Sequence, residues 1–344
     1  MSELELTLEY CFHFYKRTES ISHFKSDYLN RRFEGTLLIL VTGGAGFIGS
    51  HLADRLIERG NELVVLDNLS TGRKEFLQQH RDNLNFRFHQ VDLLTDSIDN
   101  YFIGVNEVWH LAANPDVRAA LKNTRVDLEQ NVLVTYRVLE AMRKSDVKKI
   151  VFTSTSTVYG EAEQIPTPEN YGPLIPISFY GASKLACEAL ISAFCHTFKM
   201  HAVMFRLANI IGPRSTHGVI YDFVQKLRAN PDELEILGDG NQKKSFLHID
   251  DCVEAMLFAG KERQKDQIDV YNIGSEDWIS VKEIAKIVCE KMKVKPRFKF
   301  TGGKRGWTGD VPLMRLDVSK IKGLGWMPKY NSRESVEKVV QEVV

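Results

Sequence analysis

The sequence lacks the features that mark several large classes of protein. Its five cysteines are scattered, and no pair has the spacing of a metal site or a redox motif. No apolar run approaches the roughly 18 residues that a membrane-spanning helix needs. Lysine plus arginine number 45, as do aspartate plus glutamate, and there is no basic tract of the kind that binds nucleic acid. The sequence therefore predicts a cytoplasmic protein with reduced thiols, no metal site, and neither a nucleic-acid nor a membrane partner.

The first 35 residues lack the pattern of a signal peptide. Glu3 and Glu5 stand where such a peptide carries positive charge, and no small-residue cleavage site follows an apolar core. Residues 1–35 are predicted to be a flexible leader. A docking helix or partner-binding arm is the alternative.

From Leu37 onward, short apolar runs alternate with amphipathic stretches, without an internal repeat or a low-complexity segment. Strands are expected at 37–41, 62–66, 107–111, 149–153, 202–207 and 270–273. Helices are expected at 47–59, 128–143 and 180–198. Strands that alternate with helices predict an α/β fold, a doubly wound parallel sheet of Rossmann type with right-handed crossovers.

Beyond Gly212 the pattern changes to shorter elements with more glycine and proline, and helices are expected at 220–228, 249–258 and 281–292. This change predicts a dinucleotide-binding domain at 36–212 and a smaller, mixed substrate-binding lobe at 213–344. The two are expected to be interleaved, because the strand at 270–273 returns to the sheet within a segment near 244–275.

A glycine-rich segment, Thr42–Gly49, joins the first strand to the first helix. Glycine permits positive φ in the turn and close approach of the backbone to a pyrophosphate, and the helix N-terminus presents free N–H groups to the phosphates. Asp67 follows about 20 residues later, at the end of the next strand, where a carboxylate binds an adenosine ribose and repels a 2′-phosphate. Asp67 therefore favours NAD over NADP, although Arg73 lies in the same loop.

Ligands of such sheets lie at the carboxyl ends of the strands, and the residues there are the expected cofactor contacts. They are Gly43, Gly46, Phe47, Ile48, Gly49, Asp67, Asn68, Asp92, Leu93, Leu111, Ala112, Ala113, Asn131, Tyr180 and Lys184. For Asp92, a role in capping the local loop is the alternative.

Tyr180 and Lys184 begin a predicted helix, and their spacing places them on one face, one turn apart. A tyrosine is a poor base near neutral pH because its unperturbed pKa is about 10, but a fixed ammonium beside it favours the phenolate. The pair is predicted to remove a hydroxyl proton while a hydride leaves the same carbon. A hydroxyl-rich strand end, 152–160, precedes the helix. One of its hydroxyls is expected to orient the reacting oxygen, with local turn capping as the alternative.

Together, the segments Thr42–Gly49, Thr155–Gly160, Tyr180–Lys184 and Arg206–Asn209 resemble the extended short-chain dehydrogenase/reductase family, and they are most similar to its UDP-glucose 4-epimerase branch. The resemblance runs from about Leu37 to the C-terminus. It implies that Tyr180 is the base, that Lys184 is its partner and that Thr155 is the catalytic hydroxyl. It also implies substrate contacts, to the diphosphate or the sugar, from Asn209, Lys244, Arg305 and Met314.

The resemblance implies 4-epimerisation of a UDP-hexose by a homodimer with tightly bound NAD, through a 4-keto intermediate. Dehydratases and decarboxylases of the family carry acidic residues after the catalytic threonine, where this chain has Ser156 and Thr157. The lysine that the family places near the nicotinamide is replaced by Asn114-Pro115-Asp116. Other nucleotide-sugar oxidoreductases, a 3,5-epimerase/reductase and a non-enzymatic NAD-binding protein are the alternatives. The size of Met314 does not separate UDP-glucose from UDP-N-acetylglucosamine.

Overall fold

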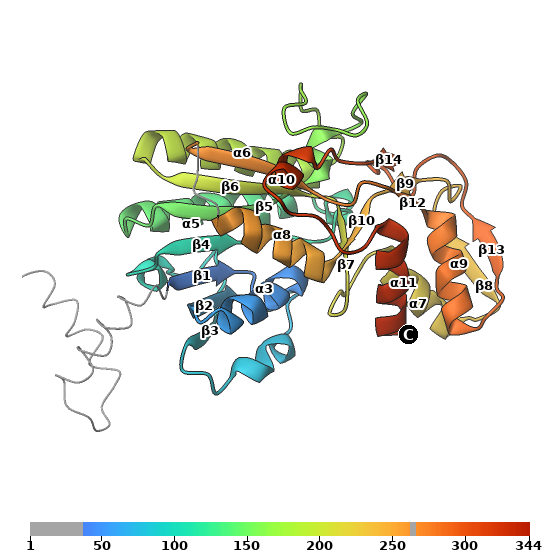
Figure 1. The fold of residues 1–344 in the computed structure, drawn as a ribbon, viewed down its shortest axis with the longest axis horizontal. Coiled ribbons are helices and arrows are strands. Elements are labelled where there is room, and N and C mark those ends of the chain that lie inside the picture. The colour runs from blue at the N-terminus through green and yellow to red at the C-terminus, as the bar shows by residue number, and fades with distance from the viewer. Residues whose placement is uncertain (1–36, 262–265) are drawn as a thin grey trace, which may run out of the picture. The chain divides into compact units, whose positions relative to one another are not determined.

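Seven parallel strands form the central sheet of the computed structural model, which describes residues 37–261 and 266–344 (Figure 1). Their order across the sheet is β11-β6-β5-β4-β1-β2-β3. Their bounds are β1 (Leu38–Thr42), β2 (Glu62–Asp67), β3 (Phe86–Gln90), β4 (Glu107–His110), β5 (Lys149–Thr155), β6 (His201–Leu207) and β11 (Ile268–Ile273). The chain runs outward in one direction from β1 and in the other from β4, which makes the sheet doubly wound, as predicted.

All six expected strands are present within two residues of their predicted bounds, and β11 pairs with β6 at the edge of the sheet as expected. The strands are apolar runs because both faces of the sheet are covered. Neighbouring side chains point to opposite faces, so Val41 packs in one apolar core and Leu40 in another.

Helices cover both faces of the sheet. On one face, α3 (Phe47–Glu58) packs beside α8 (Ile249–Lys261). On the other, α5 (Val134–Lys144) packs beside α6 (Phe179–Phe198). The chain between Arg125 and Leu133 is a short α-helix, α4 (Arg125–Asp127), that continues as a π-helix, η4 (Leu128–Leu133). None of the helices in the described part of the chain is long and apolar enough to cross a membrane.

The C-terminal part is built from a third apolar core and three small sheets. Its helices are α7 (Val219–Ala229), α9 (Val281–Met292), α10 (Ser319–Gly323) and α11 (Ser332–Val343). Its strands are β7 (Asn209–Ile211), β8 (Glu233–Ile236), β9 (Lys243–Lys244), β10 (Phe246–His248), β12 (Ile279–Ser280), β13 (Arg297–Phe300) and β14 (Leu313–Met314). Residues Leu38–Val344 form one compact unit, and their division into two domains remains a prediction. The predicted leader lies outside the described residues.

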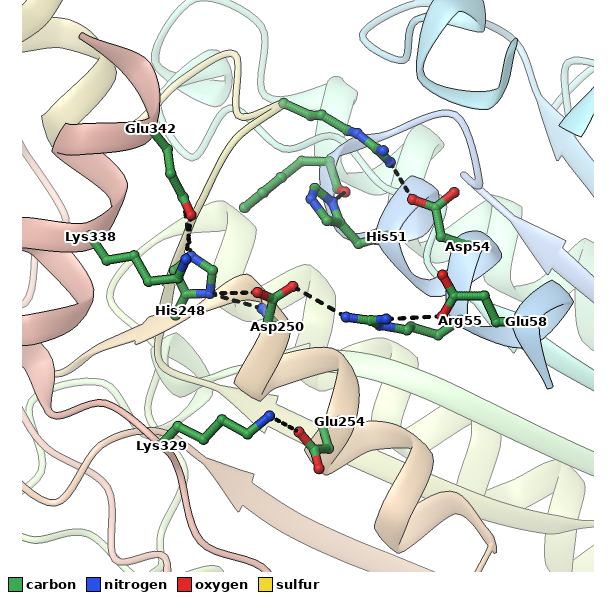
Figure 2. A network of polar contacts seen from close by, with 12 residues as sticks. His51, Asp54, Arg55, Glu58, His248, Asp250, Glu254, Lys329, Lys338 and Glu342 are labelled. Atoms are coloured by element: carbon green, nitrogen blue, oxygen red, sulfur yellow. Dashed lines mark hydrogen bonds and ion pairs between the residues drawn. The ribbon is translucent and has the colours of Figure 1, made fainter. Parts of the chain in front are cut away.

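A polar network links three helices that are distant in sequence (Figure 2). Arg55 of α3 lies 3.8 Å from Asp250 of α8, and the buried His248 lies within hydrogen-bond distance of Glu342 on α11, at 3.2 Å. The exposed Arg55–Asp250 pair stabilises the fold by only about 0–1 kcal/mol. The network therefore connects α3, α8 and α11, and the apolar cores supply most of the stability.

Candidate active site

A cavity of about 970 Å³ lies at the carboxyl ends of the parallel strands, where such sheets bind ligands. It collects most of the residues singled out from the sequence. Those that line it are Gly43, Gly46, Phe47, Ile48, Gly49, Asp67, Asn68, Asp92, Leu93, Leu111, Ala112, Ala113, Thr155, Tyr180, Lys184, Asn209, Lys244 and Met314. Asn131 and Arg305 are not among the lining residues.

The glycine-rich loop leaves no room for side chains. Gly43 has a φ of +69°, and a Cβ there would lie 2.6 Å from the backbone N of Ala112. A Cβ on Gly49 would lie 2.2 Å from the carbonyl oxygen of Gly43. Gly46 caps α3 without a side chain, so the first turn of the helix faces the cavity with backbone N–H groups. The loop has the shape and the polarity of a diphosphate cradle.

Asp67 is held rigidly at the end of β2. Its carboxylate accepts hydrogen bonds from the backbone N–H of Ala45 at 2.9 Å and of Leu69 at 2.8 Å. Burial raises the pKa of Asp67, and the two N–H donors oppose that shift. Arg73 is absent from the cavity lining and packs against the Phe76 ring, which agrees with the preference for NAD over NADP.

Asp92 caps its local loop and also lies at the cavity, so its contact with the cofactor stays a prediction. Its Oδ1 accepts the N–H of Leu94 at 2.8 Å, which is the capping role, and the residue also lines the cavity. Asn68 contacts Asp92 at 3.5 Å and accepts the N–H of Ser70. The two side chains therefore brace each other where β2 and β3 end.

Helix α6 positions Tyr180 and Lys184. Ser178 caps the helix by accepting the N–H of Gly181. The buried Lys184 Nζ donates to the carbonyl of Thr153 at 3.0 Å and lies 4.8 Å from the centre of the Phe152 ring. Burial lowers the pKa of Lys184 to about 8.

The pKa of Tyr180 departs from the expectation that Lys184 lowers it. Burial raises this pKa, and the negative charges of Asp127 and Cys187 raise it further. Desolvation is the largest of these causes. In this cavity, burial therefore favours the protonated form of the Tyr180 hydroxyl.

Thr155 caps a local turn and also lies at the cavity, and its role as the catalytic hydroxyl stays a prediction. Its Oγ1 accepts hydrogen bonds from the N–H and the hydroxyl of Thr157, each at 3.2 Å, and so caps the short turn η5 (Ser156–Tyr159). The same residue lines the cavity beside Ser156 and Thr157. Its donor hydrogen is free to turn toward a ligand oxygen.

Asn131 lies behind the cavity, on the π-helix. Its Oδ1 accepts the N–H of Asn114 at 2.8 Å and its Nδ2 donates to Ser183 at 2.8 Å, so it ties the end of β4 to α6. Being 1% exposed, its side chain supports the cofactor region from outside the lining. These buried partners occupy the amide, and the direct contact of Asn131 with the cofactor stays a prediction.

Lys244 and Arg305 meet at Asp310. Lys244 forms an ion pair with the buried Asp310 carboxylate at the rim of the cavity. Arg305 donates to the backbone oxygen of Asp310 at 2.5 Å and pairs with Glu161 at 2.7 Å. Its guanidinium faces Glu161 at the surface, whereas the neighbouring Gly306 and Trp307 line the cavity. The sequence did not define the register of the loop after β13. In the structure the Arg305 side chain lies outside the cavity lining, although a contact with the substrate diphosphate had been expected.

The comparisons with known proteins place the chain in a family. The model of the NAD dependent epimerase/dehydratase family matches residues 39–274. The chain belongs to this family. It is 36% identical over 308 residues to a putative UDP-glucose 4-epimerase of Methanocaldococcus jannaschii, covering 88% of this chain and 97% of the relative. It is 33% identical to UDP-glucuronic acid decarboxylase 4 of Arabidopsis thaliana, over 89% of this chain and 68% of the relative.

Solved structures agree with this assignment. A crystal structure of UDP-galactose 4-epimerase has a TM-score of 0.81 and 42% identity, over 90% of this chain and 100% of that chain. The chain is thus an enzyme of the epimerase/dehydratase family, and NAD is its cofactor. Among residues 37–261 and 266–344, no group of three or more His, Cys, Asp or Glu side chains is placed to hold a metal ion.

Two buried polar groups of this NAD-dependent enzyme were not predicted from the sequence as parts of the site. Arg206 forms a two-pronged ion pair with Glu188, at 3.0 and 2.7 Å, and donates to the Tyr159 hydroxyl at 3.0 Å. The pair joins α6 to β6 behind the strand end that carries Thr155. Removal of one partner from such a buried pair costs roughly 3–5 kcal/mol of stability, because the other charge is stranded.

The second group is His110, which is fully buried at the end of β4. Its ring nitrogens lie 2.7 Å from Thr42 Oγ1 and 3.0 Å from Thr135 Oγ1. Burial, with a smaller contribution from the charge of Lys184, lowers its pKa from 6.5 to about 3. The imidazole is therefore neutral in the fold and bridges the glycine-rich loop to α5.

We expect acid to destabilise the protein through His110. Below about pH 6.5 the unfolded chain takes up a proton there and the folded chain does not, until the pH approaches 3. Between about pH 6.5 and pH 4.5 this single group should remove about 2 kcal/mol of the free energy of unfolding. Urea titrations across that range should show a shallower pH dependence for His110→Gln than for the wild type. Equal slopes would show that His110 does not carry the effect.

Proposed function

We propose that the chain interconverts the C4 epimers of a UDP-hexose, with NAD bound throughout the cycle. The observation that carries this proposal is the single cavity in which Tyr180, Lys184 and Thr155 adjoin both the glycine-rich loop and Asn209. The names of several relatives, UDP-glucose 4-epimerase among them, support the same reaction. The fit of NAD rests on the Gly43–Gly49 cradle and the fixed carboxylate of Asp67.

In this proposal, the protein residues handle the proton. Tyr180 accepts the proton of the C4 hydroxyl and later returns it to the C4 oxygen, while Thr155 donates a hydrogen bond that orients that oxygen. Lys184 holds the nicotinamide ribose and contributes positive charge. When bound next to these residues, NAD would supply the hydride acceptor and donor for C4, and its positive charge would favour the Tyr180 phenolate.

The residues after Thr155 favour epimerisation over the other reactions found among the relatives. UDP-glucuronic acid decarboxylases are also similar to this chain. Elimination or decarboxylation at this site calls for a carboxylic acid beside the sugar. Ser156 and Thr157 line the cavity there, and a hydroxyl is too weak an acid and too weak a base near neutral pH. Epimerisation needs only the Tyr180 proton and a returning hydride.

The substrate diphosphate is assigned to the rim of the cavity. Asn209 lies in β7 and anchors its amide on the carbonyl of Ser245 at 3.1 Å. Lys244 lies on the adjoining β9, which pairs with β14 at Met314. An anionic diphosphate would compete with Asp310 for the ammonium of Lys244, and Met314 would contact the sugar.

Incubation of the purified protein with UDP-glucose, without added reductant, tests the proposal. Chromatographic separation of nucleotide sugars should reveal UDP-galactose, and the same mixture should form from UDP-galactose. Parallel incubations with UDP-N-acetylglucosamine and UDP-glucuronate define the sugar, and release of carbon dioxide from UDP-glucuronate would instead favour decarboxylation. Failure to form a C4 epimer from any of the three would overturn the proposal.

Lys244 offers a prediction about substrate binding. We expect Lys244→Gln to raise the KM for the nucleotide sugar about tenfold, with a smaller change in kcat, because one charge-assisted contact of about 1.5 kcal/mol is lost. Steady-state kinetics measure this split. The neighbouring Lys243 is exposed and packs over the Trp278 ring, so Lys243→Gln is the matched control and should leave KM nearly unchanged. Equal effects of the two substitutions would refute the assignment.

A homodimer remains part of the proposal. Leu128, Leu133 and Tyr136 are exposed along η4 and α5, at 51%, 43% and 45%. Exposed apolar side chains in one row are typical of a helical contact between subunits. Sedimentation velocity should give a species of twice the chain mass, and Tyr136→Glu should shift it toward the monomer.

A further inference from the structure

A buried carboxylate, Asp127, stands beside the candidate active site without a role in the reaction proposed above. It is 1% exposed, at the end of α4 where the chain passes into the π-helix. Its Oδ1 accepts hydrogen bonds from Asn114 Nδ2 at 2.9 Å and from Asn131 Nδ2 at 3.3 Å. Its Oδ2 is buried and has no hydrogen-bond partner among the residues that the structure describes.

An arrangement of this kind is costly for a protein. A buried carboxylate oxygen without a donor loses its hydration and gains no hydrogen bond in exchange. A serine or an asparagine at position 127 could accept the same two amide hydrogen bonds. The presence of an acid there therefore points to a use for its charge or its proton.

The contacts of Asp127 lead to both sides of the site. Asn114 follows the end of β4 and begins the segment 114–118, of which Pro115, Asp116, Val117 and Arg118 line the cavity. Asn131 continues to Ser183, whose hydroxyl donates to the carbonyl of Tyr180 at 2.8 Å. One carboxylate thus holds the 114–118 segment and, through Asn131, the first turn of α6.

The charge of Asp127 also reaches the two residues that handle the proton. It raises the pKa of Tyr180 and that of Lys184, and in turn the ammonium of Lys184 lowers the pKa of Asp127. Burial is the main cause that raises the pKa of Asp127, and the carboxylate of Asp116 adds to it.

The charged and titratable groups around Asp127 come from three elements. Asp116 lies on the segment after β4, and Tyr180, Lys184 and Cys187 lie on α6. On its own helical segment, Arg125 and Glu129 are paired with each other at 2.6 Å on the outer side. Lys184 is thus the cation that faces Asp127 from the catalytic helix.

We propose that Asp127 is a positioning residue for the epimerase reaction, which orders the 114–118 segment and, through Asn131 and Ser183, the first turn of α6 that carries Tyr180. This inference rests on the proposed function in treating Tyr180 as the base. The segment 114–118 takes the place of the lysine that relatives are expected to carry near the nicotinamide.

Asp127→Asn in the NAD-loaded enzyme tests the inference. The amide retains the size of the side chain and an acceptor for Asn114, and it removes the charge. We expect the ionisation midpoint of Tyr180 to fall by about one pH unit. The midpoint is read from phenolate absorbance, as the difference between each holoenzyme and its Tyr180→Phe counterpart. The acidic limb of kcat/KM for the nucleotide sugar should move to lower pH by the same amount.

Two further variants keep the test decisive. Glu129→Gln removes an equal charge from the same helical segment, where the carboxylate is paired with Arg125, and it should leave both midpoints in place. If Asp127→Asn does not retain NAD, Asp127→Ser removes the charge with a smaller side chain. The Tyr180 midpoint of that variant is measured by the same phenolate absorbance. A merely structural role predicts lower kcat without any shift in the midpoint, and that result would overturn the inference.

The absorbance measurement does not depend on turnover. If the wild type converts no UDP-hexose, the proposed function fails, yet the shift of the Tyr180 midpoint still decides whether Asp127 controls that tyrosine. If the wild type is active and the midpoint is unchanged, the function stands and the role of Asp127 is refuted.

Discussion

Replacement of Tyr180 by phenylalanine is expected to lower kcat by about 10²–10⁴-fold, the usual contribution of a positioned acid–base group. Tyr180 and Lys184 are the residues of α6 that line the cavity, near the end of β5. The substitution removes only the hydroxyl, so the NAD content and the melting temperature should stay near those of the wild type. Conversion of UDP-glucose under saturating substrate measures the effect.

The matched control for this prediction is Tyr101→Phe. Tyr101 packs beside His89, away from the cavity lining, and its ring centre lies 4.8 Å from that of the histidine. Its loss of a hydroxyl should leave kcat within about twofold. A Tyr180→Phe enzyme that retained more than a tenth of the wild-type kcat would exclude Tyr180 as the base.

The substitution Gly49→Ala is expected to raise the dissociation constant for NAD at least tenfold. The new Cβ would lie 2.2 Å from the Gly43 oxygen and 2.7 Å from the Gly44 Cα, so the glycine-rich loop must move. These are backbone atoms that cannot rotate away, and overpacking of this kind costs about 1–3 kcal/mol or more. Equilibrium dialysis of NAD against the purified variant measures the change.

Gly323 provides the control because it also lies in a helix, α10, and a Cβ there meets nothing within 4 Å. Gly323→Ala should preserve NAD binding and should raise stability slightly, since alanine favours the helix by up to about 1 kcal/mol. Loss of NAD from both variants would mean that substitution of any helical glycine weakens NAD binding. In that case the glycine-rich loop would have no special role in holding NAD.

The sheet could be predicted from the sequence because its strands are short, continuous apolar runs. Such runs are stable when flanking helices bury both faces of the sheet, so the apolar run marks the strand. The bounds of β1, β5 and β6 therefore lie within two residues of the expected ones. The small strands β9, β12 and β14 have two residues each, and no periodicity can be detected over that length. Helix α11 was missed although Asn331 and Glu334 form a capping box at its start.

The cofactor side of the site was predicted more completely than the substrate side. The contacts of the glycine-rich loop and Asp67 follow from local chain geometry, which a motif encodes. Lys244 and Arg305 belong to segments brought together across the chain, and Arg305 turns toward Glu161 instead of the cavity. Their placement depends on loop register, which the sequence leaves open.

The buried supports of the site are the hardest to infer. His110, Glu188 and Asp127 are polar residues within otherwise ordinary helices and strand ends, and each acquires its partner only on folding. The partners of His110 lie 68 and 25 residues away, and Arg206 lies 18 residues from Glu188, so no local spacing rule reveals them. The shift of the Tyr180 pKa depends on the same buried surroundings.

The most direct test of C4 epimerisation is the fate of hydrogen at that carbon. UDP-glucose with deuterium at C4 is incubated with the purified holoenzyme, without added cofactor, and the nucleotide sugars are analysed by mass spectrometry. The account predicts UDP-galactose that retains the deuterium, because the same hydride returns to the carbon it left. Product without deuterium, or no epimer at all, would contradict it.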